Sequence, residues 1–279
     1  MDAGTLELSI LFPAFLAGLL VLSTHVPLGQ HVLNRGIVFI DLAIAQVAGL
    51  GVTVASALGL DSGATDHGAA AAGDWHIQVA AVAAALLGAL LLTWTEKVWP
   101  EVQEALIGVL FAVAACVELL FLASNPHGGE KLKDLLVGQI LWVQPVNLIP
   151  VAILYALALA AWFGLKNRMG QIGFYVLFAL VVTQSVQLVG IYLVFASLIL
   201  PALAAKRFAP KYALAVGYGT GLIGYVGGLI ASNAFDLPTG AVIVVALLVM
   251  LIVAVLASLV VPAGMRAVRG AAPVPHAAE

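Results

Sequence analysis

The chain has 279 residues, of which 63% are hydrophobic and 9% are charged, and its formal net charge is −3. A soluble domain usually has about 25% charged residues, so this composition excludes a soluble globular protein and predicts a polytopic membrane protein. The chain has no block of basic residues, which argues against nucleic-acid binding.

Apolar runs of helical length follow one another along the chain. Backbone polar groups in lipid must be hydrogen-bonded within the protein, so a spanning chain is helical or forms a closed barrel. Runs of about 20 apolar residues favour helices over the alternating strands of a barrel. We therefore predict an all-α polytopic protein with about eight or nine transmembrane helices, one region of which is broken or re-entrant. Residues 1–279 are expected to form a single transmembrane domain.

The predicted spans are, in chain order, 8–27, 37–60, 77–95, 105–124, 146–165, 174–205, 212–233 and 240–262. The first span is expected to end at Pro27, after the polar stretch STHV. Because the N-terminus lacks a basic region, we expect this run to be retained as a span and not removed as a signal peptide.

Two stretches do not fit a simple span. Residues 135–145 are apolar but too short to cross a bilayer, so they are expected to be re-entrant or interfacial. Residues 174–205 are too long for one span, whereas two full spans need about 40 residues. This stretch is therefore either two short crossings or a span followed by a half-helix.

The distribution of basic residues predicts the orientation in the membrane. The positive-inside rule places most of them in the cytoplasm, namely Arg35, Lys97, Lys166, Arg168, Lys206, Arg207, Lys211, Arg266 and Arg269. The N-terminus and the acidic loop 61–76 then lie outside, the C-terminus lies inside, and the number of crossings is odd, nominally nine. Lys131 and Lys133 fall outside and do not fit the rule.

Three polar residues within predicted spans are candidates for a translocation path. Ionisable side chains inside a bilayer are costly and commonly functional. Asp41 and Glu118 are such residues, and Gln46 is an amide in the same span as Asp41. Asp41 and Gln46 diverge by about 140° around a helix, so they do not form an i,i+4 ligand pair. The structural alternative for Asp41 is pairing with local backbone amides or a neighbouring helix, and for Glu118 it is a paired or protonated role.

Small residues recur four apart in the span 212–233, as Gly217 with Gly221 and Gly224 with Gly228. Such spacing lets helices approach closely in lipid. Packing within the chain is the ordinary interpretation, and a subunit interface is the alternative.

Several motifs of enzymes and metal-binding proteins are absent from the sequence. It contains no GxxxxGK[ST] loop, GxSxG or HExxH motif, and its single cysteine, Cys116, excludes a thiolate cluster. We therefore predict that the chain is not an enzyme and binds no cofactor. Uphill transport would draw its energy from a separate subunit or from an ion gradient.

Five stretches, in order along the chain, resemble the ABC-3 type permeases of zinc and manganese importers. They are VLNRGIVFIDLAIAQVAGLG, EALIGVLFAVAACVELLFL, LKDLLVGQILWV, VQLVGIYLVFASLILPALAAKRF and FDLPTGAVIVV. The resemblance implies a type II importer-like fold, a homodimer, two cytoplasmic ATPase subunits that bind ATP, and an extracytoplasmic solute-binding protein. It also implies a prokaryotic plasma (inner) membrane location and a transported divalent metal.

The same resemblance implies that residues 201–207, with Pro201, Ala205, Lys206 and Arg207, contact the ATPase. A basic segment that ends a helix is consistent with a cytoplasmic docking element. The alternative is an ordinary positive-inside anchor.

The chain departs from the family pattern in two places. The family pairs its aspartate with a histidine four residues later, whereas this chain has Ala45 there, followed by Gln46. Imidazole suits zinc or manganese, whereas an amide is a poor zinc ligand. The polar segment before the broken helix is also short, KNRMGQIG.

Together these features predict the membrane subunit of an ATP-driven importer of divalent transition-metal ions, with Asp41 on the ion path and Gln46 and Glu118 assisting. One alternative is import of a metal chelate, such as a siderophore or a corrinoid. Another is an ion-driven secondary transporter, for which inverted repeats would be expected. A purely structural membrane subunit would not need Asp41 or Glu118.

Overall fold

A computed structural model describes residues 3–59, 75–123, 128–165, 168 and 170–261. The described residues form helices and no strands, as predicted. The helices are α1 (Ala3–Arg35), α2 (Ile40–Ala57), α4 (Trp75–Val98), α5 (Gln103–Ala123), α6 (Gly128–Val137), α7 (Pro145–Leu165), α8 (Gln171–Val189), α9 (Ile191–Ala205), α10 (Pro210–Phe235) and α11 (Thr239–Val260), with short 3-10 turns at η1 (Pro100–Val102) and η2 (Ile140–Trp142).

Eight of the described helices are long and apolar enough to cross a membrane, and α9 is a shorter apolar helix of 15 residues. The prediction of an all-α polytopic protein is therefore confirmed. Exposed tryptophans stand at both ends of α4, with Trp75 at its start and Trp94 and Trp99 at its end. Aromatic residues of this kind favour the two interfaces of a bilayer.

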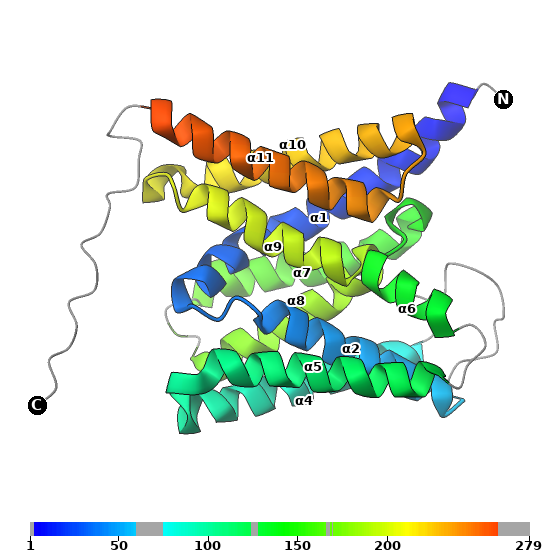
Figure 1. Cartoon of the computed structure of the whole chain (residues 1–279), viewed down its shortest axis with the longest axis vertical. Helices are drawn as coiled ribbons and strands as arrows, with labels where there is room; N and C mark the ends of the chain where they lie inside the picture. Colours follow the sequence, from blue (N-terminus) through cyan, green and yellow to red (C-terminus); the bar gives the residue numbers. More distant parts are fainter. Residues whose placement is uncertain (1–2, 60–74, 124–127, 166–167, 169, 262–279) are drawn as a thin grey trace, which may run out of the picture.

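The helices lie side by side in a stack, with α10 and α11 on one side and α4 and α5 on the other (Figure 1). Between them lies α8, in which 67% of the most apolar 18-residue stretch is buried inside the protein. In α11 only 17% of the equivalent stretch is buried. The core of the molecule therefore follows α1, α8 and α9, and the outer helices present apolar side chains to lipid.

The two ends of the stack differ in charge. The end of α1, the α4–α5 turn and the α9–α10 turn lie together, at the left of Figure 1, and carry Arg35, Lys97, Lys206 and Arg207. We call this the basic end. The start of α1, the α10–α11 turn and α6 lie at the opposite end. Lys166, Arg266, Arg269 and most of the acidic loop 61–76 are outside the described residues.

The first helix does not end at Pro27, as the sequence led us to expect, but continues to Arg35. Proline cannot donate to the carbonyl four residues earlier, and this usually breaks a helix. Here the Tyr218 hydroxyl of α10 donates to the Ser23 carbonyl, over 2.9 Å. The neighbouring helix thus satisfies the group that Pro27 leaves unpaired, as membrane helices permit.

The predicted broken region is a pair of helices, α8 and α9, which meet at Gly190 with no intervening loop. Gly190 has φ 81° and Gly138, just after α6, has φ 72°. The two backbones touch, because a methyl group at Gly190 would lie 2.3 Å from the Gly138 nitrogen. The segment after α6 therefore packs directly on the α8–α9 turn, and neither position accommodates a side chain.

Candidate functional site

Asp41 lies in the first turn of α2 and is fully buried. Neither of its carboxylate oxygens has a hydrogen-bond partner among the described residues. A carboxylate near a helix N-terminus is favoured by the helix dipole, but this offsets little of the cost of burying an unpaired charge. Asp41 is thus a buried carboxylate whose packing provides no partner.

Glu118 of α5 is fully buried against α2 and is hydrogen-bonded. The Gln46 amide donates to its Oε2 atom, and the Thr53 hydroxyl donates to its Oε1 atom over 3.0 Å. Gly49 faces the carboxylate, and a methyl group there would lie 3.4 Å from Oε1, an ordinary contact distance. One face of α2 therefore holds the Glu118 carboxylate in a defined position.

A cavity of about 390 Å³ lies beside this cluster, between α2, α5, α6 and α9. Its lining is mostly apolar, with Leu42 and Gln46 contributed by α2, while Asp41 is not part of it. The Gln46 amide thus connects the cavity to Glu118. The remaining lining residues are Phe111, Ala115, Leu119, Leu132, Leu136, Ile191, Tyr192 and Phe195.

The structure brings Gln46 and Glu118 together and leaves Asp41 on another face of α2. The angular separation of about 140° expected for positions 41 and 46 explains this split. Among the described residues, no group of three histidine, cysteine, aspartate or glutamate side chains could hold a metal ion. Ala45, one turn after Asp41, is buried and adds no ligand.

Thr53 belongs to the cluster but was not singled out from the sequence. It follows Gln46 by seven residues, which is about two helical turns and places both on one face. That spacing could have indicated that Thr53 lies on the same polar face as Gln46. A threonine in an apolar helix commonly bonds its own backbone, so the partner became evident only when α5 was seen to pack on α2.

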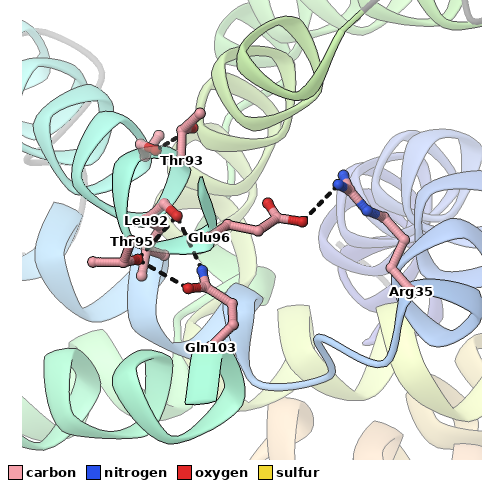
Figure 2. Close-up of polar contacts among 7 residues, drawn as sticks. Arg35, Leu92, Thr93, Thr95, Glu96 and Gln103 are labelled. Carbon is pink, nitrogen blue, oxygen red and sulfur yellow. Dashed lines mark hydrogen bonds and ion pairs between the residues drawn. The ribbon is translucent and has the colours of Figure 1, made fainter. Parts of the chain in front are cut away.

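A second polar cluster lies at the basic end. Arg35 Nη2 donates to Glu96 Oε1 over 2.8 Å, and the two side chains point toward each other in Figure 2. The Arg35 guanidinium carbon also lies 5.4 Å from the centroid of the Phe174 ring of α8. Arg35 therefore joins the ends of α1 and α4 to the start of α8.

The segment predicted to contact an ATPase is the end of α9. Pro201 and Ala205 are buried within the helix, and Lys206 and Arg207 are exposed immediately after it. The two cations are thus presented at the surface of the basic end, next to a buried helix that reaches the core.

The glycines of α10 contact two neighbouring helices of the same chain. A methyl group at Gly217 or Gly221 would clash with Val26 or Leu22 of α1. One at Gly224 or Gly228 would clash with Leu247 or Ile243 of α11. Each GxxxG pair thus faces its own partner helix.

Comparison with known proteins identifies the family. The model of the ABC 3 transport family matches residues 7–169 and 157–258. The chain is 24% identical to "High-affinity zinc uptake system membrane protein ZnuB" of Haemophilus influenzae, over 85% of this chain and 93% of the relative. It is 25% identical to "Probable metal transport system membrane protein" of Thermotoga maritima, over 86% of each.

A solved structure has the same fold. "PsaBC from Streptococcus pneumoniae in complex with Fab" superposes with a TM-score of 0.68 at 21% identity, and the match covers 88% of this chain and 90% of that one. The resemblance inferred from the five sequence stretches is therefore confirmed. This multi-pass membrane protein belongs to the ABC 3 transport family.

Proposed function

We propose that the chain is the permease subunit of an ATP-driven importer of divalent transition-metal ions, of the zinc or manganese class. Two copies would enclose the path, two cytoplasmic ATPase subunits would bind and hydrolyse ATP, and an extracytoplasmic binding protein would deliver the ion. The complex would lie in the plasma membrane of a prokaryote. Membership of the family and the similarity to zinc and metal transport proteins support this proposal.

The observation that carries the proposal is the carboxylate of Asp41, which is buried and has no partner among the residues that the structure describes. A charge that is buried without a partner costs several kcal/mol, of the order found for broken buried ion pairs. A protein that gains nothing from such a group would be more stable without it. A divalent cation that passes Asp41 would supply the missing partner, which gives the carboxylate a role that packing does not.

Gln46, on another face of α2, and Glu118, on the neighbouring α5, offer further oxygen ligands. The amide holds one oxygen of Glu118, and Gln46 borders the cavity. A cation that reaches Glu118 would compete with this amide, so binding would be weaker than in a preformed cage. Weak, sequential binding suits transport, because an ion must leave each site as well as enter it.

The donor set that these residues provide consists of carboxylate and amide oxygens. Oxygen ligands suit manganese and other hard cations, whereas imidazole and thiolate suit zinc. Ala45 leaves no imidazole beside Asp41. Within the zinc and manganese class, this favours manganese.

The end of α9 is the proposed site of ATPase contact. Lys206 and Arg207 are exposed there, and α9 borders the cavity through Ile191 and Phe195. Because the same helix lines the cavity and ends at the basic end, a displacement of α9 at that end would also move the cavity wall. The permease itself would carry out no catalysis.

The experiment is uptake into proteoliposomes that contain the permease, its ATPase and its binding protein. We expect uptake of Mn²⁺ or Zn²⁺ that requires internal ATP and stops with a non-hydrolysable analogue. Uptake driven by an ion gradient without ATP would support the secondary transporter instead. Uptake of a siderophore or corrinoid complex without uptake of the free ions would support the chelate alternative.

A further inference from the structure

The linker 36–39 between α1 and α2 lies two residues before the buried Asp41. Gly36 has φ 75° and turns the chain out of α1, and Ile40 begins α2. Any displacement of this linker therefore moves the first turn of α2, which carries Asp41.

Two glutamates hold the chain here, one at Arg35, the last residue of α1, and one at Phe39 within the linker. On one side, Arg35 donates to Glu96 over 2.8 Å, and their side chains are 22% and 14% exposed. On the other side, the Phe39 backbone N–H donates to Glu104 Oε1 over 3.3 Å. Hydrogen bonds to charged groups are stronger than neutral ones, so these two contacts tie the linker to α4 and α5.

Both glutamates belong to the α4–α5 hairpin, whose two helices are joined by hydrogen bonds of a buried side chain. The buried Gln103 donates to the Leu92 carbonyl over 3.0 Å and accepts from the Thr95 hydroxyl over 2.9 Å (Figure 2). These bonds join the start of α5 to the last turn of α4 across the turn. A displacement of the hairpin would consequently withdraw Glu96 and Glu104 together.

The closed arrangement leaves several carboxylate oxygens unsatisfied. Glu96 Oε2 and Glu104 Oε2, like both oxygens of Asp41, are buried without a hydrogen-bond partner among the described residues. Water solvates such oxygens well, and leaving them unpaired is costly. Displacing the hairpin from the linker would expose these oxygens to water. Their hydration would offset part of the free energy needed to separate Arg35 from Glu96.

The linker also contacts the helix proposed to meet the ATPase. The Phe39 ring stacks on the Phe195 ring of α9, with centroids 6.5 Å apart and planes 4° from parallel. Phe195 lies in the helix that ends at Lys206 and Arg207. A shift of α9 would therefore displace Phe39, whose backbone N–H donates to Glu104.

We infer that the α4–α5 hairpin is an inner gate. Glu96 holds Arg35 at the end of α1, Glu104 holds the linker 36–39, and both act as positioning residues, or latches, that keep Asp41 closed to the basic end. Opening requires that both latches release, after which Asp41 faces the cytoplasm and the cation departs. This inference rests on the proposed function, because it assigns Asp41 to the ion path.

The test measures access to position 41 from each side of the membrane. The full-length permease would carry Cys116→Ala, which removes the native thiol, and Asp41→Cys, which reports access. A membrane-impermeant maleimide would be applied to inside-out and to right-side-out vesicles. We expect slow labelling from both sides with the latches intact.

Adding Glu96→Gln keeps the shape of the side chain and removes its charge. We expect it to raise the labelling rate in inside-out vesicles by roughly tenfold, the effect of about 1.4 kcal/mol on a gating equilibrium. Glu104→Gln should act in the same direction. The charge exchange Arg35→Glu with Glu96→Arg should return the rate toward that of the parent.

The matched control is Glu101→Gln, since Glu101 is exposed in the turn of the same hairpin. Labelling should be unchanged by this variant. An unchanged rate with Glu96→Gln, an equal rise with Glu101→Gln, or an equal rise in right-side-out vesicles would each overturn the gate. Because labelling needs no transport, a complex that imports no metal would reject the proposed function and leave this test intact.

Discussion

Gln46 of α2 donates a hydrogen bond to Glu118 of α5, and both side chains are buried. This contact joins the polar face of α2 to the helix that packs on it, at the edge of the cavity. With Thr53 on the other carboxylate oxygen, it fixes Glu118 in one position. The contact therefore has a structural role that can be measured apart from transport.

Gln46→Leu removes the amide and keeps a similar volume. Glu118 then retains the Thr53 bond alone, so we expect the free energy of unfolding to fall by about 1–3 kcal/mol. Thermal unfolding of the purified permease, followed by tryptophan fluorescence, measures this. Gln187→Leu is the control, because the Gln187 amide nitrogen has no partner among the described residues. Equal losses in the two variants would contradict the role of Gln46.

The two adjacent glycines Gly227 and Gly228 of α10 should respond differently to alanine. A methyl group at Gly228 would lie 2.6 Å from the Ile243 Cα atom, whereas nothing lies within 4 Å of one at Gly227. We expect Gly228→Ala to destabilise the protein by about 1–3 kcal/mol through overpacking. Gly227→Ala should leave stability unchanged or raise it by up to about 1 kcal/mol through helix propensity.

Those two variants share one helix and one chemical change, so their difference in melting temperature isolates the contact between α10 and α11. A similar shift in both would mean that the glycine contact does not determine how these helices pack.

Reversing the charges at the end of α9 should weaken ATPase binding. Lys206→Glu combined with Arg207→Glu changes two exposed residues, so we expect stability to stay within about 0.5 kcal/mol. Co-purification of the ATPase with the permease should be lost. Lys133→Glu, an exposed position on α6 at the opposite end, should leave co-purification intact. Loss of the ATPase in both variants would instead indicate a nonspecific effect of charge.

The all-helical architecture and the gathering of basic residues at one end could be predicted, because hydropathy and charge depend on short stretches of sequence. The continuation of α1 past Pro27 was not, since it depends on the Tyr218 hydroxyl, 195 positions from Ser23 in the chain. The direct contact between Gly138 and Gly190 likewise joins distant segments. The sequence pattern identifies residues that are out of place in an apolar helix. Which partners these residues contact depends on how the other helices pack.

The same distinction applies to the candidate site. Asp41 and Glu118 stood out because a carboxylate in an apolar run is rare. The sequence could not tell that Glu118 has partners while Asp41 has none among the described residues. That difference depends on α5, which supplies the Glu118 carboxylate to α2 and supplies nothing to Asp41.

The most direct test of the account combines transport and stability in one variant, Asp41→Asn, which keeps the shape of the side chain and removes its charge. We expect ATP-dependent uptake of the metal ion by the reconstituted complex to fall by at least about tenfold, as for other losses at metal sites. The melting temperature of the same preparation should not fall, because neither Asp41 oxygen makes a hydrogen bond to the described residues that the variant would lose. Unchanged uptake by a folded Asp41→Asn permease would contradict the account.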